Sequence, residues 1–365
     1  MFRKSILMIV CICFFSPKLE AQQVVTGRIT DAVDGSPVQN VQIYISNTSV
    51  GTTSNASGNY SITVPIKGSF EIVMLHIGYQ PVFHKINTPQ SFHQHDAALK
   101  LNIREIEEVI VNVHKNYGQK DIDLFWSIIL GAKPSKNGME VLNPEKVRYY
   151  LSSNKVLKAS CKEPIEIVNH QMGYRIRYIL QSFQLNYRNN VFEFHGTSYF
   201  EELTPQNSHQ KNRWEKKRQE AYAVSIIRFI QALYREQIHE EGFLLVNRDS
   251  LRRGKPSLIL LKDILQADQD MMLVNIKAPL FLMCYSKPVT NRMIQNLSYR
   301  DIWTGEKRFP IVELRPQQIT IYSDGTYTGV LKVQSRREYI FGLSSMMPVE
   351  YGQTTELGEM KRQIN

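Results

Sequence analysis

Hydrophobic and polar residues alternate with a period of two in the first part of the chain, over residues 22–101. The alternating runs are rich in Val, Ile, Tyr and Phe, and they read VVTGRIT, VQIYIS, GNYSITVP, SFEIVMLHIGY and PVFHKI. Polar segments that contain Gly, Pro, Asn and Asp separate the runs at intervals of about 8 to 12 residues. This pattern predicts a domain of short antiparallel strands folded as a β-sandwich.

Glycines mark the tightest turns expected in this sandwich. Asp34-Gly35 and Ser57-Gly58 both stand between alternating runs. A tight turn there requires the positive backbone angle that glycine adopts without strain. Pro37 then fixes the entry to the following run. Folding alone accounts for these residues, so the pattern predicts a scaffold and not a catalytic site.

Residues 119–352 combine both periods and predict a mixed α+β domain. The segment DIDLFWSIILGA, with Asp121 expected as its N-cap and Gly131 at its end, predicts a short buried helix. Successive antiparallel strands are predicted by KVRYYLSSNKVLKAS, IEIVNHQMGYRIRYILQSFQLNY and NVFEFHGTSYFEEL. Asp324-Gly325, between two alternating runs, predicts a β-hairpin. The whole chain is therefore expected to be mostly β, with a mixed α+β second domain.

Residues 210–243 carry the clearest helical pattern and predict one long amphipathic helix. Its apolar residues recur at spacings of three and four: Tyr222, Ile226, Phe229, Ile230, Leu233 and Tyr234. The start of this helix is basic, and cations there oppose the helix macrodipole at a cost of about 0.3 to 1 kcal/mol each. We interpret this start as a candidate patch for an anionic partner: Lys211, Arg213, Trp214, Lys216, Lys217 and Arg218. An ordinary solvated helix face is the alternative.

A β-prone segment joins the two predicted domains. Residues 102–118 read NIREIEEVIVNVHKNYG, in which an acidic pair precedes an apolar run. We interpret the run as a candidate docking strand for an exposed sheet edge: Val109, Ile110, Val111 and Val113. An ordinary interdomain strand is the alternative. Residues 353–365 are expected to form a polar C-terminal tail.

Residues 1–21 have the pattern of a secretory signal peptide. A basic start at Arg3 and Lys4 precedes an apolar run from Ile6 to Phe15, and cleavage is expected after Ala21. The run is about half the length of a membrane-spanning helix, so no transmembrane span is expected in the mature chain. Removal of these residues lowers the net charge from +10 to +8, because they carry three cations and one anion. A basic exported chain suits anionic lipid or glycan surfaces, and no nucleic acid is expected among its partners.

The sequence offers few candidates for metal or catalytic chemistry. Cys161 and Cys284 fit either a disulfide in an oxidising compartment or two free buried thiols. The densest set of metal-binding residue types is HQHD, from His93 to Asp96, in a segment expected to be a solvated polar loop. No HExxH, GxSxG, phosphate-loop or dinucleotide motif occurs in the sequence. We therefore expect a protein that is not an enzyme and that uses no cofactor or metal.

Some residues of the first domain form a pattern that is shared with a known family. They lie in VTGRITDAVDGSPVQNVQIYI, GTTSNASGNYSITVP and IGYQP. They are Gly27, Asp31, Gly35, Pro37, Val38, Val41, Thr53, Gly58, Tyr60, Gly78 and Tyr79. This combination resembles the carboxypeptidase regulatory-like domain of exported Bacteroidota envelope proteins and of TonB-dependent receptor N-terminal extensions. The resemblance implies a transthyretin-like sandwich and no peptidase activity. The sequence departs from the family before Gly58, where an acidic residue is common and this chain has Asn55, Ala56 and Ser57.

Three segments of the second domain carry a further resemblance. NHQMGYRIRY, WEKKRQEAYAVS and MMPVEYG are similar to an uncharacterised region that follows this sandwich in exported Bacteroidota proteins. The resemblance implies the architecture of the chain and assigns no role to these segments.

Together these patterns predict a non-enzymatic exported protein, in the periplasm or at the outer membrane, that acts as a binding or assembly module. The first alternative is an accessory component of a TonB-linked uptake system, with EIEEVIVNV as its contact. The second alternative is an unrecognised hydrolase in residues 119–352 that uses His170, His195 and nearby carboxylates. A deep pocket lined by both histidines would favour the hydrolase.

Overall fold

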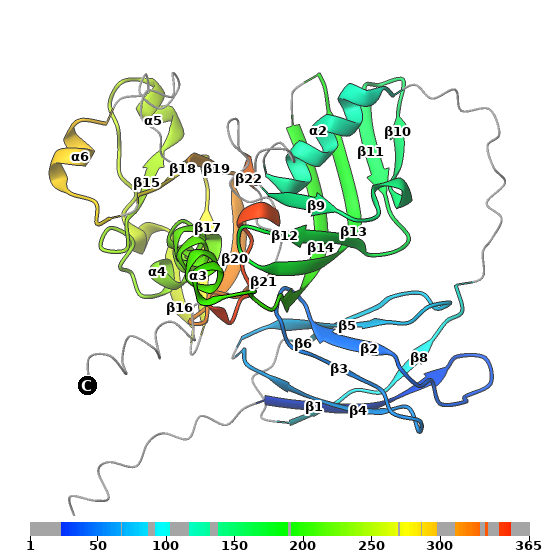
Figure 1. Cartoon of the computed structure of the whole chain (residues 1–365). Coiled ribbons are helices and arrows are strands. Elements are labelled where there is room, and N and C mark those ends of the chain that lie inside the picture. The colour runs from blue at the N-terminus through cyan, green and yellow to red at the C-terminus, as the bar shows by residue number, and fades with distance from the viewer. Residues whose placement is uncertain are drawn as a thin grey trace, which may run out of the picture.

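The computed structural model shows three packed units. It describes residues 23–66, 68–86, 92–102, 117–131, 138–188, 191–268, 271–285, 287–297, 311–328, 333–334 and 343–351. Figure 1 shows a sandwich at the bottom, a sheet covered by one helix above it, and a third unit of strands and helices beside that sheet. Strands predominate and helices are concentrated in the second half of the chain, which confirms the predicted fold class.

The first unit is the predicted sandwich, with one difference in strand pairing. One sheet has the order β4-β1-β7 with β8 also paired to β1, and the other has the order β3-β2-β5-β6. The pairing of β1 with β7 and β8 is parallel, whereas the sequence pattern predicted antiparallel strands throughout. The strands are β1 (Gln23–Asp31), β2 (Gln42–Ile45), β3 (Gly51–Thr53), β4 (Asn59–Val64), β5 (Phe70–Leu75), β6 (Val82–Ile86), β7 (Phe92–Gln94) and β8 (Ala97–Leu99).

The two turn glycines of the sandwich have the predicted backbone conformation. Gly35 has a φ of 72° and Gly58 a φ of 78°, so both lie in the left-handed region. A Cβ atom on Gly58 would lie 2.3 Å from the carbonyl oxygen of Ile29, which leaves no room for a side chain. Inside the sandwich, alternate residues of the strands form one core that includes Val25, Ile43 and Ile72.

The second unit is an antiparallel sheet with a helix on one face. The order is β10-β11-β13-β12-β9, with β14 paired to β13 along a long hairpin. Helix α2 (Gln119–Leu130) covers one face, and its Phe125 and Ile129 are fully buried against the sheet. The strands are β9 (Met139–Val141), β10 (Arg148–Leu151), β11 (Val156–Ser160), β12 (Ile165–Asn169), β13 (Tyr174–Asn186) and β14 (Val191–Glu202), with a 3-10 turn η2 (Pro144–Lys146).

Helix α2 confirms the predicted short helix but begins earlier than expected. Gly118 is the N-cap, and the Asp121 carboxylate accepts a hydrogen bond from the Gly118 amide at 2.8 Å. Asp121 was expected as the N-cap, and it lies one turn inside because a residue at this position can bond back to the cap amide. Gly131 ends the helix with a φ of 79°, as predicted.

The third unit has its own hydrophobic core. Two sheets, β15-β18-β19-β22 and β16-β17-β20-β21, surround buried residues such as Phe243 and Leu282. The predicted hairpin at Asp324-Gly325 is confirmed, because β20 pairs with β21 across these residues. The strands are β15 (Phe243–Asn247), β16 (Leu265–Asp268), β17 (Met271–Ile276), β18 (Leu280–Cys284), β19 (Ile311–Leu314), β20 (Gln317–Tyr322), β21 (Tyr327–Thr328) and β22 (Val333–Gln334).

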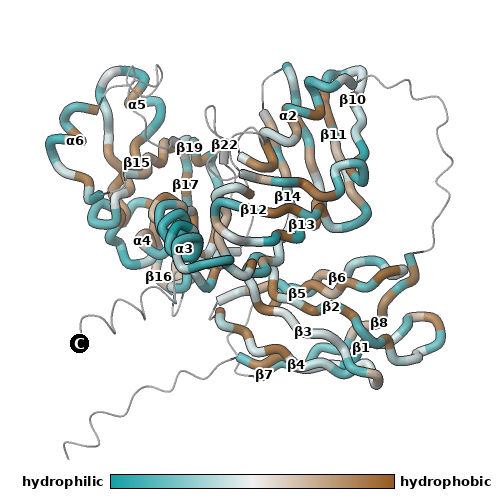
Figure 2. The backbone as a smooth tube through the Cα atoms, in the orientation of Figure 1, coloured by the Kyte–Doolittle hydropathy of each residue, from teal (hydrophilic) through white to brown (hydrophobic). Residues whose placement is uncertain are grey.

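The helices of the third unit correct the prediction of one long helix. The predicted segment forms two helices, α3 (Ser208–Ala223) and α4 (Ile226–Tyr234). Ser225 caps the second, because its hydroxyl accepts a hydrogen bond from the Arg228 amide at 3.1 Å. The apolar stripe was largely a property of α4, whereas Figure 2 shows α3 as hydrophilic along most of its length. The remaining helices are α5 (Arg248–Arg252) and α6 (Asn291–Gln295), with 3-10 turns η3 (Leu261–Asp263) and η4 (Leu343–Ser345).

The two cysteines of the described chain are free thiols. Cys161 is half-buried beside the core of the second unit, and Cys284 is buried in the core of the third. Burial raises the pKa of Cys284 to about 12, so this thiol stays protonated at neutral pH. Among the described residues, no helix is long and apolar enough to cross a membrane.

Candidate functional site

The turn after β2 attaches the sandwich to the sheet of the second unit. The Asn47 amide donates to the Ser198 carbonyl at 2.7 Å, and the Asn47 side-chain oxygen accepts from the Ser198 amide at 3.0 Å. The Phe200 amide donates to the Thr48 carbonyl at 3.0 Å. Asn47 has a φ of 61°, a left-handed conformation that asparagine adopts more readily than most residues. The turn therefore continues the edge of β14 with backbone hydrogen bonds.

An apolar contact supports this attachment. Tyr44 and Val73 of the sandwich and Ile179 of β13 are buried together. The rings of Tyr44 and Tyr199 lie 5.0 Å apart in a tilted arrangement. Burial raises the pKa of the Tyr44 hydroxyl, so this side chain enters the contact neutral. The sandwich is thus fixed to the outer face of the sheet, opposite α2.

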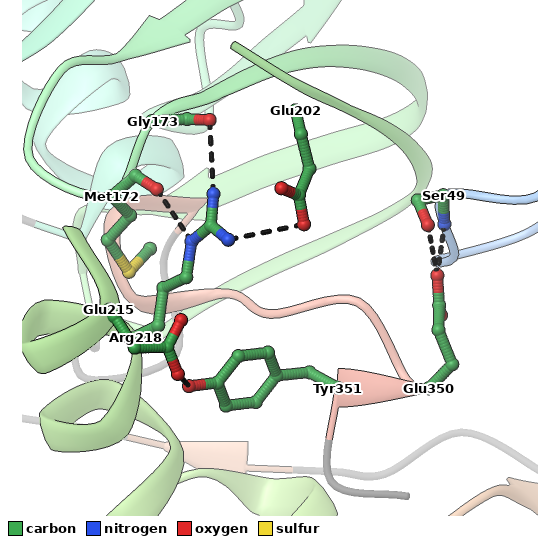
Figure 3. A network of polar contacts seen from close by, with 8 residues as sticks. All are labelled: Ser49, Met172, Gly173, Glu202, Glu215, Arg218, Glu350 and Tyr351. Carbon is green, nitrogen blue, oxygen red and sulfur yellow. Dashed lines mark hydrogen bonds and ion pairs between the residues drawn. The ribbon is translucent and has the colours of Figure 1, made fainter. Parts of the chain in front are cut away.

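Residues 343–351, which we name the closing segment, contact all three units. The Ser49 amide and hydroxyl of the sandwich donate to Glu350 at 2.6 and 2.5 Å (Figure 3). The Asn169 side chain donates to the Ser344 carbonyl at 3.2 Å. The Tyr351 hydroxyl donates to the Glu215 carboxylate of α3 at 2.7 Å. One short segment thereby joins the sandwich, the sheet and the first helix of the third unit.

Arg218 is the centre of the polar network at this junction. Its side chain is buried, with a residue exposure of 7%, and the guanidinium lies 4.0 Å from the centre of the Tyr174 ring. It donates to the Met172 carbonyl at 2.8 Å, to the Gly173 carbonyl at 3.3 Å and to the Glu202 carboxylate at 3.2 Å (Figure 3). These bonds satisfy the Met172 carbonyl of the turn between β12 and β13 and give a second donor to the Gly173 carbonyl, which also accepts from the Leu203 amide at 2.9 Å.

Trp214 lies one helical turn before Arg218 and contacts the same turn. Its indole N–H donates to the His170 carbonyl at 2.9 Å, and the residue is only 5% exposed. A Cβ atom on Gly173 would lie 2.2 Å from the Trp214 ring. Gly173 also has a φ of 68°, so both its conformation and its surroundings require glycine.

Burial of Trp214 and Arg218 corrects the predicted anionic-partner patch. Both side chains face the β12–β13 turn, so they belong to the packing of the fold and not to a surface. The four other cations of the patch are exposed: Lys211, Arg213, Lys216 and Lys217. Lys217 pairs with Glu220 at 2.7 Å on the same helix. We name these four residues the basic face of α3.

The structure brings together the three segments that sequence reasoning had grouped without a role. The segment NHQMGYRIRY supplies His170, Met172 and Gly173, and WEKKRQEAYAVS supplies Trp214 and Arg218. The segment MMPVEYG supplies Tyr351. These residues meet around the β12–β13 turn. Burial and the hydrogen bond to Glu215 raise the pKa of the Tyr351 hydroxyl, so it acts as a neutral donor. In the sequence, the spacing of four residues between Trp214 and Arg218 already indicates that both side chains lie on one face of the helix.

The histidines named for a hydrolase do not form one site. His170 pairs with Glu140 at 2.7 Å at the β12–β13 turn, where both side chains are 57% exposed. His195 pairs with Ser182 in the β13–β14 ladder, eight residues along β13 from Tyr174. At about 3.3 Å per residue, this places the two histidines about 25 Å apart.

The HQHD cluster spans the end of a strand and the polar connection that follows it. His93 and Gln94 belong to β7, and Asp96 accepts a hydrogen bond from the Arg28 amide at 2.7 Å. The His95 ring stacks on His84 of β6 with 3.5 Å between ring centres. No group of three His, Cys, Asp or Glu residues that could hold a metal ion occurs in the part of the chain that the structure describes.

The stacked pair of imidazoles makes the sandwich sensitive to acid. Burial is the main cause that lowers the pKa of both rings. The neighbouring His93 lowers the pKa of His84 further. The pKa of His95 is lowered further by His84 and is partly raised again by Asp96. The folded chain then binds fewer protons than the unfolded chain, whose histidines titrate near pH 6.5. Stability is therefore fully present above about pH 6.5 and declines as the pH falls below it.

We expect the melting temperature to fall between pH 7.5 and pH 5.5, and to fall less in a His84→Gln/His95→Gln variant. Thermal unfolding followed by circular dichroism at each pH measures this difference. His209→Gln, an exposed residue of α3, is the matched control and should keep the full decline. An equal decline in the double variant would show that the stacked pair does not contribute to it.

Two hollows of the surface are large enough for a small ligand. One, of about 390 Å³, lies at the junction of the three units, between Lys85, Ile226 and Met346. The other, of about 590 Å³, lies on the outer face of the sheet over β10, β11, β13 and β14. The predicted docking strand, Val109, Ile110, Val111 and Val113, lies outside the described residues, as do the expected signal peptide and most of the polar tail.

This chain is similar to part of a much longer protein. A TonB-dependent receptor P39 from Formosa agariphila is 32% identical to this chain over 106 residues. The match covers 29% of this chain, which spans about a tenth of the length of that relative.

Solved structures overlap with this chain only in part. The 5-hydroxyisourate hydrolase of Klebsiella pneumoniae is 12% identical, and the match covers 22% of this chain and 90% of that one with a TM-score of 0.20. A putative carbohydrate binding protein from Bacteroides uniformis is 9% identical, and the match covers 49% of this chain and 80% of that one with a TM-score of 0.19.

The CarboxypepD_reg-like domain family matches residues 25–111. The first unit of this protein is therefore a carboxypeptidase regulatory-like domain, as its turn residues had indicated.

Proposed function

We propose that this chain is a non-enzymatic exported protein of the cell envelope, in which the regulatory-like sandwich braces a region for binding or assembly. The observation that carries the proposal is the attachment of the sandwich to β14 and to the closing segment through Asn47 and Ser49. A sandwich held by backbone hydrogen bonds and by the buried Tyr44 is suited to positioning its neighbour. The basic composition of the chain supports an anionic envelope surface as the partner.

The basic face of α3 is the surface proposed for this contact. Lys211, Arg213 and Lys216 are exposed on the solvent side of the helix, while Trp214 and Arg218 anchor its other side. Because the other side of the helix is buried, the backbone that carries these cations is held against the β12–β13 turn. Attraction between exposed charges weakens as the Debye length shrinks from about 10 Å at 0.1 M salt to about 3 Å at 1 M.

Lys211→Gln/Arg213→Gln/Lys216→Gln should lower retention of the protein on envelope fractions at 0.1 M salt and leave the melting temperature unchanged. Co-sedimentation with the fractions measures retention. The matched control is Arg253→Gln/Lys255→Gln/Lys262→Gln, which removes the same charge from exposed positions of the third unit. Equal retention of the two triple variants, or retention that 1 M salt does not reduce, would contradict the proposal.

A second candidate function is that of an accessory component in a TonB-linked outer-membrane uptake system. It is favoured by the similarity to the TonB-dependent receptor of Formosa agariphila, although that match is confined to 29% of this chain. Affinity capture of the full chain from envelope fractions, followed by mass spectrometry, tests it. A receptor recovered with the wild-type chain in stoichiometric amounts is the expected result.

A further inference from the structure

The outer face of the second unit's sheet is divided into two halves. The sandwich covers the half that contains Ile179 and Tyr199. The other half, over β10, β11 and the far part of the β13–β14 hairpin, carries the hollow of about 590 Å³. Figure 1 shows α2 on the opposite side of this sheet, so the helix does not fill the hollow. Polar side chains are exposed on this uncovered half of the sheet.

A β-bulge shapes the hollow. The register of β13 against β14 shifts between Leu180 and Ser182, so Gln181 is an extra residue on β13. Both Gln181 and Ser182 are exposed and line the hollow. A bulge bends its strand and redirects the side chains around it, and bulges are common next to binding sites. The long hairpin is therefore bent at this half of the sheet.

Four side chains form a row across the four strands of this face. Tyr150 is paired with Lys158, Lys158 with Gln184, and Gln184 with Glu193. Strands lie about 4.8 Å apart, so the row extends over about 14 Å. Such a row is long and shallow, which suits an extended chain molecule better than a compact ligand.

The chemistry of the row differs between its two ends. At one end, Tyr150 is 48% exposed and lies beside Lys158 and Arg148. Neither cation has an ion pair or hydrogen bond within the described part of the chain. At the other end, the Gln184 amide donates to Glu193 at 3.0 Å, and both keep oxygen atoms free to accept hydrogen bonds. His195 lines the same end.

These groups match the parts of an acidic sugar chain. The apolar face of a sugar ring packs on an exposed aromatic ring, whose electron-rich face attracts C–H groups. A carboxylate forms strong charge-assisted hydrogen bonds with Arg and Lys. Hydroxyl groups both donate and accept, so they suit the amide and carboxylate of Gln184 and Glu193. A nucleic acid strand fits less well, because its bases need successive aromatic rings on which to stack.

We propose that this hollow binds an acidic oligosaccharide. Tyr150 packs on a sugar ring, Arg148 and Lys158 bind its carboxylate, and Gln184, Glu193 and His195 bind hydroxyl groups of the neighbouring ring. The inference rests on the proposed function as a binding module, but it uses a different surface from the basic face of α3. It names the ligand class by its chemistry, a chain of uronic acids.

Binding is tested by isothermal titration calorimetry of the purified full chain with a hexamer of galacturonic acid. The neutral hexamer of glucose is the matched ligand and should bind at least tenfold more weakly. Arg148→Gln/Lys158→Gln should weaken binding of the acidic hexamer about tenfold, which corresponds to about 1.4 kcal/mol. Tyr150→Ala should weaken it to a similar extent, and Tyr150→Phe should retain it because the ring remains.

The α3 variant Lys211→Gln/Arg213→Gln/Lys216→Gln separates this site from the envelope contact. This variant should bind the acidic hexamer as the wild type does. Loss of envelope retention together with unchanged sugar binding would support both the envelope contact and the separate sugar site. Absence of binding to the hexamer, or binding that the Arg148/Lys158 and Tyr150 variants leave unchanged, would overturn the sugar site. Vesicles of phosphatidylglycerol that displace the hexamer and bind through the same residues would assign the site to lipid instead and overturn it too.

Discussion

Arg218→Gln is expected to lower the free energy of unfolding by about 3 kcal/mol. The substitution removes the donor to the Met172 carbonyl, which then lies buried at the β12–β13 turn without that partner. The Gly173 carbonyl loses one of its two donors and keeps the Leu203 amide at 2.9 Å. An unsatisfied buried carbonyl costs about 1 to 3 kcal/mol, and the packing of the guanidinium on Tyr174 is lost as well. Urea denaturation followed by tryptophan fluorescence measures the change.

Lys217→Gln is the neighbouring control for this result. Lys217 is exposed and pairs with Glu220 on the helix surface, so its loss should change stability by less than about 0.5 kcal/mol. Arg218→Lys should recover only part of the stability, because a lysine ammonium lacks the planar donor fork that reaches both carbonyls and Glu202. If Arg218→Gln and Lys217→Gln have equal effects, then Arg218 is not structural.

Gly173→Ala is expected to destabilise the chain by about 2 to 5 kcal/mol. Two costs combine: a left-handed backbone costs an alanine about 1 to 2 kcal/mol, and crowding of a packed site costs about 1 to 3 kcal/mol more. The crowding arises because the added Cβ would lie 2.2 Å from the Trp214 ring. The same urea titration measures the effect.

Gly254→Ala isolates the backbone part of this cost. Gly254 has a φ of 71°, close to that of Gly173, and a Cβ atom there would meet nothing within 4 Å. Its substitution should cost about 1 to 2 kcal/mol, which is the strain of the left-handed conformation alone. Equal losses for the two alanine variants would mean that the Trp214 ring moves away without cost.

The sandwich could be predicted in detail because its signals are local. Gly35 and Gly58 each lie within a few residues of the strands that they join, and their positive φ angles follow from the turn sequence itself. The parallel pairing of β1 with β7 and β8 could not be predicted in this way. Val24 and Phe92 are partners far apart in the sequence, and alternation does not distinguish parallel from antiparallel neighbours.

The basic start of α3 carries a buried face that its charges conceal and its helical spacing indicates. Trp214 and Arg218 are four residues apart, with Tyr222 four further on, and residues at this spacing share one face. The same pattern suggests that this arginine lies among aromatic residues. Its partners could not be foreseen, because Met172 and Gly173 reach it only through the tertiary fold. The end of α3 was hidden as well, since Ser225 acts as a cap within an otherwise continuous helical pattern.

The hollow on the sheet was absent from the sequence interpretation for a related reason. Tyr150, Lys158, Gln184 and Glu193 are dispersed over four strands, and only the register of the sheet places them in one row. The bulge at Gln181 adds to the difficulty, because it shifts the alternation by one residue within β13. Sites of this kind require knowledge of strand pairing.

The contact between Ser49 and Glu350 joins residues that are 301 positions apart in the chain. During synthesis of the chain from its N-terminus, the sandwich emerges long before the closing segment. The sandwich can therefore fold while its junction with the other units is still incomplete. The last native contacts then depend on closure of a very long loop, and contacts of this range form slowly. Until they form, the surface around Asn47 and Tyr44, which the junction covers in the folded chain, is exposed to solvent.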